Sequence, residues 1–338
     1  MVPTEILARQ HYQELAPLFE ALGFSVGLLV GSCSAKEKAE VRRRLNAPEG
    51  ERLSLLIGTH ALLEEGVVFS ALALTVTDEQ HRFGVMQGAA LQKKGQGAHL
   101  LVMSATPIPR TLALTLYGDL AVSRIEQMPA GRQKVSTFVL DDSYRPRLYG
   151  FLREQVRTGG QVYMVCPAIE DKEEAEDEEI SLSDLLQQDA MPPLRSAEGL
   201  VRSLREEIFP DIPIGYLHGR MRGVDKDAEM RRFATGETKI LVSTTVIEVG
   251  VNVPEATVMV VENAERFGLS QLHQLRGRVG RGSRKSYCFL LSQIKSGPAY
   301  ERLQTMHTTY DGYEIAKADL AQRGPGDFFS SLALSTQA

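Results

Sequence analysis

The feature of this chain of 338 residues that most constrains its fold is the alternation of short apolar runs with polar, helix-forming stretches. Apolar runs occur at 53–57, 72–76 and 100–103, and again at 162–165, 240–242, 258–261 and 287–291. Stretches with helical character occur at 34–45, with Ser34 as the expected N-cap, and at 145–157, 196–208, 225–234 and 269–277. Buried strands that alternate with helices are typical of parallel sheets covered by helices, so the sequence predicts an α/β protein.

Two such α/β units are expected in succession. Proline and glycine interrupt the pattern at 129–135 (PAGRQKV), which predicts a junction there. The net charge of −5 is unevenly distributed: residues 170–179 hold eight acids and one lysine, whereas 276–285 hold five basic residues in ten. We therefore expect an exposed acidic loop at 170–193, and local charge is a better guide to partners than the total.

Several classes of protein are excluded by what the chain lacks. No apolar run approaches the roughly 18 residues of a membrane span, and the first residues do not have the pattern of a signal peptide. Cys33, Cys166 and Cys288 lie too far apart in sequence for a disulfide framework or a zinc site. We predict a protein of the cytoplasm that does not enter a membrane.

A pair of adjacent carboxylates, Asp78 and Glu79, directly follows the apolar run ALALTVT. At the carboxyl end of a buried parallel strand, such a pair suits a phosphate and Mg²⁺ site, in which one carboxylate holds the ion through water and the other polarises the attacking water. A polar turn between strand and helix is the alternative for an isolated pair.

Two further segments carry possible chemistry. Ser104-Ala105-Thr106-Pro107 follows the apolar run HLLVM, and the sequence QLRGRVGR spans 274–281. Its glycines allow close approach of the backbone to a ligand. Arg278 and Arg281 suit the charge that develops on a transferring phosphoryl group, although a solvated basic turn is equally compatible with them.

Together these segments resemble the motifs of superfamily-two helicases and translocases, and most closely those of the RecG family, which are bacterial ATP-dependent helicases that remodel branched DNA. The matching segments run in order along nearly the whole chain: PTEILARQH (3–11), GTHALL (58–63), DEQHRFGV (78–85), SATPIPRT (104–111), VYMVCPAIE (162–170), LHGRM (217–221), VSTTVIEVGVNVP (242–254) and QLRGRVGR (274–281). The resemblance implies two tandem RecA-like lobes that clamp ATP between them. The transcription-repair coupling translocases are the nearest alternative branch.

The resemblance also implies roles for individual residues around the nucleotide. Asp78 would hold Mg²⁺ through water, and Glu79 would act as general base. Nucleotide contacts from the second lobe are implied for Gln274, Arg278, Arg281, Gly250 and Asn252. Ser104 and Thr106 would couple the nucleotide state to the grip on DNA.

Contacts to the DNA backbone are implied for a further set of residues. Hydroxyls and backbone amides suit this task because phosphate contacts set the register without reading sequence. A structural role in a turn remains the alternative for each of them, and most of all for the pair His218 and Gly219. The set comprises Pro3, Thr4, Gly58, Thr59, His218, Gly219, Thr244 and Thr245.

The chain departs from the family pattern near its start. The sequence G-x-x-x-x-G-K-[ST], which cradles phosphates, does not occur in it. By the resemblance, the wedge domain and the central strand of the first lobe are also absent, and this should leave unpaired strand edges and exposed apolar surface. We therefore expect a carboxyl-terminal fragment that contains no phosphate-binding loop and that, by itself, hydrolyses ATP poorly.

The end of the chain departs as well. Residues 301–329 resemble the family's helical hairpin for translocation, with Arg323 in its coupling turn, but the sequence after Phe329 differs. The expected domains are a truncated first lobe at 1–130, a second lobe at 131–296 and an incomplete hairpin at 297–338.

Two functions remain open at this point. The first is an ATP-driven motor that acts on branched DNA; it would work as a monomer in the bacterial cytoplasm, at the nucleoid. The second is a nucleic-acid-binding module without turnover of ATP. A metabolic α/β enzyme has little support, because the chain has neither a nucleophile-and-base set nor a G-x-G-x-x-G sequence. A contact with single-stranded-DNA-binding protein is not readable from the sequence.

Overall fold

The computed structural model divides the chain into two compact units, described one at a time below. The first holds Met1–Ala105 with Val249–Val251 and Arg323–Ala338, and the second holds Thr106–Glu248 and Asn252–Gln322. The structure describes residues 1–48, 50–78, 94–95, 97–104, 121–123, 125, 127, 133–167, 197–244, 253–319 and 321. The expected acidic loop at 170–193 and most of the expected junction at 129–135 lie outside these residues.

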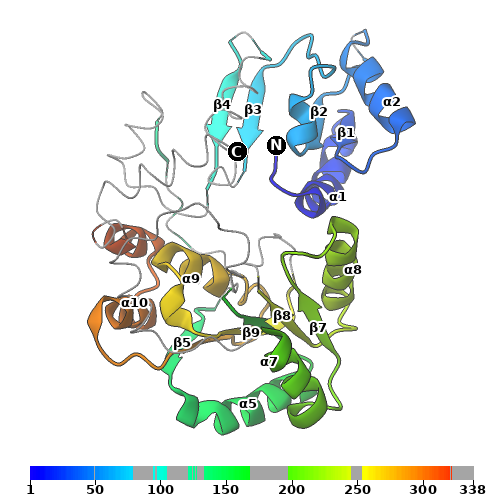
Figure 1. Ribbon diagram of the computed structural model, residues 1–338. Helices are drawn as coiled ribbons and strands as arrows, with labels where there is room; N and C mark the ends of the chain where they lie inside the picture. Colours follow the sequence, from blue (N-terminus) through cyan, green and yellow to red (C-terminus); the bar gives the residue numbers. More distant parts are fainter. Residues whose placement is uncertain are drawn as a thin grey trace, which may run out of the picture. The chain divides into compact units, whose positions relative to one another are not determined.

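The first unit contains two separate pairs of parallel strands (Figure 1). Its elements are α1 (Glu5–Ala21), β1 (Val26–Leu29), α2 (Ala35–Leu45), β2 (Leu55–Gly58), η1 (His60–Leu63), β3 (Leu74–Thr77) and β4 (His99–Val102). β1 pairs with β2, and β3 pairs with β4. Leu74 on β3 is 53% exposed and Leu101 on β4 is 46% exposed. The expected exposure of apolar side chains is therefore found on these two strands, and no described strand pairs β2 with β3.

Side chains of β1 and β2 alternate between two apolar clusters, one on each face of the pair. Leu29 and Leu56 belong to the cluster that includes Leu45 of α2, whereas Val26 and Ile57 belong to the cluster that includes residues of α1. A strand pair covered on both faces must be apolar at consecutive positions, which explains the run LSLLI in the sequence.

Helix α2 begins where the sequence predicts. The Ser34 hydroxyl accepts a hydrogen bond from the Glu37 amide at 3.3 Å, and the Glu37 carboxylate accepts one from the Ser34 amide at 2.7 Å. This capping box satisfies two amide groups that the first turn leaves without helical partners. Three consecutive arginines lie in the last turn, where their positive charge interacts favourably with the negative end of the helix dipole.

The second unit is built on a six-stranded parallel sheet with the order β5-β10-β9-β6-β8-β7. Its elements are β5 (Ser136–Leu140), η3 (Asp142–Tyr144), α5 (Arg145–Arg157), β6 (Gln161–Val165), α7 (Ala197–Ser203), η4 (Leu204–Ile208), β7 (Ile214–Leu217), α8 (Gly223–Ala234), β8 (Ile240–Ser243), β9 (Ala256–Val261), η5 (Ala264–Arg266), α9 (Leu269–Arg276), β10 (Tyr287–Leu291) and α10 (Gly297–Thr308). Residues 312–319 are also helical.

Helices cover both faces of this sheet. Leu152 of α5 and Leu204 of η4 pack with Val162 and Met164 of β6 on one face. On the other face, the ring of Tyr163 lies 4.6 Å from that of Phe233 on α8. The strands β6, β8 and β9 are buried along their whole length, so the parallel α/β fold predicted from the sequence is confirmed.

Several elements were not predicted from the sequence. These are α1, β1, β5 and β7, whereas α10 lies within the helical hairpin expected at 297–338. β5 and β7 lie at the two edges of the sheet, where partial exposure weakens the apolar pattern; Phe138 of β5 is 40% exposed. The predicted helix 196–208 is an α-helix only to Ser203 and continues as the π-helical η4.

Candidate functional site

In the first unit, two predicted site residues follow the carboxyl ends of paired strands. Asp78 comes directly after β3, and Ser104 follows β4 by two residues. The two strands are parallel neighbours, with Met103 donating a backbone hydrogen bond to Thr77 at 2.8 Å, so both residues lie at the same end of the pair. Glu79 and Thr106, their expected partners in catalysis and coupling, lie outside the described residues.

The Asp78 carboxylate lies beside a base on α1. Its Oδ2 is 3.4 Å from Nε2 of His11, and both side chains are partly exposed. Carboxylate oxygens are the ligands that Mg²⁺ prefers in proteins, so Asp78 has the chemistry for the predicted ion. Within the part of the chain that the structure describes, no group of three or more His, Cys, Asp or Glu side chains could hold a metal.

The predicted DNA contacts of the first unit all have local structural roles. Thr4 is the N-cap of α1, and its hydroxyl accepts a hydrogen bond from the Leu7 amide at 3.4 Å. Gly58 ends β2, where an added Cβ would lie 2.1 Å from the Leu29 carbonyl oxygen. Thr59 is 3% exposed and precedes η1, and Pro3 is half-buried before Thr4.

In the second unit, the structure brings three predicted DNA contacts to neighbouring strand ends. His218 and Gly219 follow β7, and Thr244 follows β8, its partner strand. The Thr244 amide donates to the Leu217 carbonyl at 3.0 Å, and the His218 ring stacks on Tyr216 with 5.1 Å between centroids. Thr245, Gly250 and Asn252 lie outside the described residues.

The predicted nucleotide contacts of the second unit cluster at the carboxyl end of α9. Gln274 lies in its last turn, and Arg278 and Arg281 follow its end. Both guanidinium groups lie near Tyr163: burial raises the pKa of this phenol, and the two positive charges oppose the rise. Gly280 has a φ of +77°, which favours glycine, and it places the arginines on a tight turn.

A third arginine of the same segment, Arg276, has a different environment. It is 4% exposed, and its Nη1 donates to the carbonyl oxygens of Met306 at 3.0 Å and Thr309 at 2.8 Å. Its guanidinium also stacks on Tyr310, 4.8 Å from the ring centroid. Arg276 therefore binds the end of α10. The sequence motif gives it no separate role, because its neighbours Leu275 and Gly277 do not distinguish it from Arg278 and Arg281.

Asp319 gives α9 a second contact with the segment that follows α10. Its Oδ2 accepts a hydrogen bond from the Ser270 hydroxyl at 2.8 Å. Arg323, the predicted coupling residue a few positions later, lies outside the described residues.

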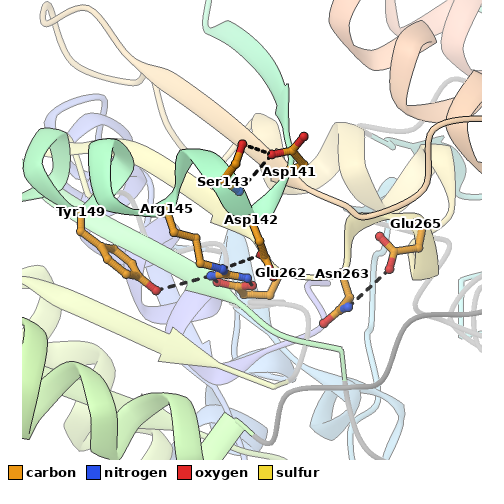
Figure 2. A network of polar contacts seen from close by, with 8 residues as sticks. All are labelled: Asp141, Asp142, Ser143, Arg145, Tyr149, Glu262, Asn263 and Glu265. Atoms are coloured by element: carbon orange, nitrogen blue, oxygen red, sulfur yellow. Dashed lines mark hydrogen bonds and ion pairs between the residues drawn. The ribbon is translucent and has the colours of Figure 1, made fainter.

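A buried ion pair at the carboxyl end of β9 was also missed by sequence reasoning. Arg145 donates two hydrogen bonds to the Glu262 carboxylate, at 2.8 and 2.7 Å, and a third from Nε to Asp142 at 2.6 Å (Figure 2). Burial opposes the charge of Arg145, but its bonds to Glu262 raise its pKa above the ordinary value. The pair ties the start of α5 to the end of β9, across 117 positions of sequence.

Beyond Glu262, the chain turns sharply toward α9. Asn263 has a φ of 46°, and its amide donates to the Glu265 carboxylate at 3.4 Å, as Figure 2 also shows. Glu265 is 1% exposed, and Arg302 of α10 donates to its carbonyl oxygen at 3.0 Å. These contacts fix the turn that leads into the arginine-bearing helix.

Comparison with known proteins identifies two helicase domain families in the chain. Residues 1–115 match the DEAD/DEAH box helicase family, and residues 147–283 match the helicase conserved C-terminal domain. A structure of Dbp5 from Saccharomyces cerevisiae bound to RNA has a TM-score of 0.61 at 15% identity over 94% of this chain and 80% of that one, a likeness of fold alone. Among the described residues, no helix is long and apolar enough to span a bilayer.

Much closer similarity is found to RecG proteins. The ATP-dependent DNA helicase RecG of Synechocystis sp. is 50% identical over 98% of this chain and 37% of its own length. That of Bacillus subtilis is 45% identical over 97% of this chain and 45% of its own. A structure of RecG bound to a three-way DNA junction has a TM-score of 0.76 at 43% identity, covering 97% of this chain and 40% of that one. The chain thus spans less than half the length of these relatives. It carries two RecA-like helicase domains and is similar to RecG helicases over nearly its whole length.

Proposed function

We propose that this chain carries the motor of an ATP-dependent DNA helicase or translocase that remodels branched DNA, such as stalled forks and Holliday junctions, in recombination and repair. The observation that carries the proposal is the similarity of 97–98% of the chain to RecG proteins, one of which is described bound to a three-way DNA junction. The division into domains at 1–130, 131–296 and 297–338 is part of the same proposal.

In this proposal, the first unit supplies the carboxylates. Asp78 holds Mg²⁺ through water, and Glu79 accepts a proton from the attacking water. Bound with ATP, the ion would offset charge on the phosphoryl oxygens. The position of Asp78 at a strand end, with its carboxylate partly exposed, supports this role.

The second unit supplies positive charge. Gln274, Arg278 and Arg281 contact the phosphates of the same nucleotide, and Gly250 and Asn252 line its site. The grouping of Arg278 and Arg281 at the end of α9, both near Tyr163, supports a joint role. An arginine placed against a transferring phosphoryl group contributes roughly 10³–10⁵ to the rate in other nucleotide hydrolases.

DNA is bound through phosphate contacts at strand ends. The clustering of His218, Gly219 and Thr244 beside one another supports this for the second unit. Ser104, Thr106 and Arg323 couple the state of the nucleotide to the grip on DNA. The remaining proposed contacts are Pro3, Thr4, Gly58, Thr59 and Thr245. We also propose that the protein acts as a monomer in the bacterial cytoplasm, at the nucleoid.

The 338 residues alone should turn ATP over slowly, because they contain no G-x-x-x-x-G-K-[ST] sequence to cradle the phosphates. This observation favours the second candidate function, a nucleic-acid-binding module without turnover.

One experiment separates the two functions. Binding of fluorescently labelled three-way junction and duplex DNA is measured by anisotropy over a salt series, and ATP hydrolysis is measured with each DNA. We expect tighter binding to the junction, with an affinity that falls steeply as salt rises. Turnover stimulated by the junction and lost in Glu79→Gln excludes the binding module; salt-dependent binding without any turnover excludes motor activity for this chain. Equal, salt-insensitive binding to both DNAs contradicts the proposal as a whole.

A further inference from the structure

Three nearly parallel aromatic rings lie on two neighbouring strands of the second unit. The ring of Phe138 on β5 stacks on that of Phe289 on β10, with 5.6 Å between centroids and 19° between planes. The ring of Tyr287, two positions earlier on β10, lies 6.3 Å from that of Phe289, with 10° between planes. These spacings are those of favourable aromatic pairs in proteins. We call Tyr287, Phe289 and Phe138 the aromatic array.

Helix α5 covers one end of the aromatic array and leaves the other open. The ring of Phe151 on α5 meets those of Tyr287 and Phe289 edge to face, at 5.0 and 5.5 Å. Phe289 is accordingly only 8% exposed, whereas Phe138 is 40% exposed. β5 is also an edge strand, with β10 on one side and no described strand on the other. The Phe138 ring therefore packs on Phe289 with one side and is open to solvent on another.

The backbone at this edge of the sheet is less open than the Phe138 ring. The Ser136 amide donates to the Ser286 carbonyl at 2.9 Å, so the backbone groups of Ser136 face β10. Backbone groups along a strand alternate in direction, and those of Thr137 therefore face the open edge. The Thr137 carbonyl already accepts a hydrogen bond from Nδ1 of His307 on α10, at 2.7 Å. A strand added to β5 would have to break this bond, which disfavours an extended peptide as the occupant.

Positive charge flanks the aromatic array at both ends of the strands. Lys285 is exposed just before β10, and its Nζ lies 5.6 Å from the centroid of the Tyr287 ring. Lys295 follows β10; its side chain is 81% exposed, and its Nζ lies 3.7 Å from the carboxylate of Asp141. Single-stranded DNA matches this combination, because its bases stack on aromatic side chains while its phosphates are attracted to nearby cations.

We propose that Phe138 is a stacking site for one nucleobase of a DNA single strand, whose phosphates are attracted to Lys285 and Lys295. Such a site has little sequence preference, because every base has a π-face. It is distinct from the proposed phosphate contacts at His218 and Thr244, which follow β7 and β8 toward the opposite edge of the sheet. The inference rests on the proposed function only for the choice of DNA as the ligand.

A tryptophan at position 138 reports stacking directly, because the chain contains no other tryptophan. The emission of Phe138→Trp is followed during titration with a short single strand of mixed sequence, and with an abasic strand of the same length. The abasic strand has the phosphates without the bases. Val224→Trp on α8, where the native side chain is 79% exposed, is the matched control position. We expect the intact strand to quench Phe138→Trp much more than the abasic strand does, and Val224→Trp to respond alike to both.

Affinities measured by anisotropy test the ring at position 138 without a fluorophore on the protein. Phe138→Leu keeps an apolar contact with Phe289 but has no planar ring, whereas Phe138→Tyr keeps the ring. Phe138→Leu should weaken binding of the intact strand by about fivefold or more. Phe138→Tyr should bind it as the unmodified chain does, and the abasic strand should bind equally to all three. Lys285→Gln should weaken binding of both strands. Circular dichroism checks that the variants are folded.

A fully paired three-way junction separates this site from the proposed function, because it offers no unstacked base. Phe138→Leu should bind the junction as the unmodified chain does. Failure of the unmodified chain to bind the junction contradicts the proposed function, while its stacking on single strands is judged by the quenching alone. Equal quenching by the intact and abasic strands, or equal affinity of Phe138→Leu and the unmodified chain for the intact strand, would overturn the stacking site. Absence of any response to the intact strand would also overturn it and would favour an aromatic side chain of a protein as the occupant.

Discussion

Replacing Arg145 by methionine should strongly destabilise the second unit. Glu262 is 2% exposed, and its carboxylate receives two hydrogen bonds from Arg145. Arg145→Met keeps much of the side-chain volume but leaves this carboxylate buried without its cation. Removal of one partner from a buried pair typically costs about 3–5 kcal/mol. For a unit of this size, the midpoint of thermal unfolding should decrease by roughly 10 °C.

The control lies on the same helix. Arg157 forms an ion pair with Glu154 one turn away, and both side chains are mostly exposed. Because water screens such a pair, Arg157→Met should leave the midpoint almost unchanged. The double variant Arg145→Met/Glu262→Met removes both buried charges and should recover most of the loss of the single variant.

The assay must report the second unit separately, since two units need not unfold together. The chain contains no tryptophan, so we suggest denaturation followed by circular dichroism, with amide exchange of β6 and β9 to locate the effect. Exchange in β9 should increase most in Arg145→Met. If Arg145→Met costs no more than Arg157→Met, or if the double variant is worse than the single, the ion pair does not have the role described above.

Three further outcomes are expected. Burial lowers the pKa of the Met1 amino group from 8.0 to about 6, so between pH 6 and 8 the unfolded chain binds more protons than the folded chain. The free energy of unfolding should therefore rise by ~2–3 kcal/mol from pH 6 to 8, and acetylation of Met1 should abolish this rise. Gly280→Ala should cost ~1–3 kcal/mol in denaturation, because φ is +77° and Val135 lies 2.9 Å from the added Cβ, whereas Gly150→Ala, in an open helical position, should be neutral or stabilising. Arg276→Met should cost ~1–3 kcal/mol and accelerate amide exchange in α10 before α5, because two carbonyls lose their donor; a uniform acceleration would contradict this.

The strands that the sequence predicts well are those buried on both faces. β6, β8, β9 and β10 are found within two residues of the predicted runs, because full burial requires consecutive apolar residues. Edge strands such as β7 (IGYL) lack that signal, since exposed positions and glycine interrupt it. The cap at Ser34 was predictable because it depends on residues only three positions apart.

Contacts between distant residues could not be predicted in this way. Nothing in the spacing of Arg145 and Glu262 indicates that they meet, because the sheet order that joins α5 to β9 is set by the whole fold. Arg276 shows a related difficulty: it lies between Gln274 and Arg278 in sequence, yet its helix turns it toward α10. A motif shows which residue types are present and how they are spaced, but the burial of each side chain in the fold decides which of them face a ligand.

In the proposed motor, the carboxylates of the first unit and the arginines of the second act on one nucleotide. The most direct test of this joint action is the distance between spin labels at exposed positions of the two units, Lys36→Cys and Arg147→Cys with Cys33→Ser, measured by double electron–electron resonance. With millimolar Mg²⁺, a non-hydrolysable ATP analogue and three-way junction DNA, we predict one narrow distance distribution that Arg281→Ala broadens. A distribution that neither the nucleotide nor Arg281→Ala changes would contradict the account.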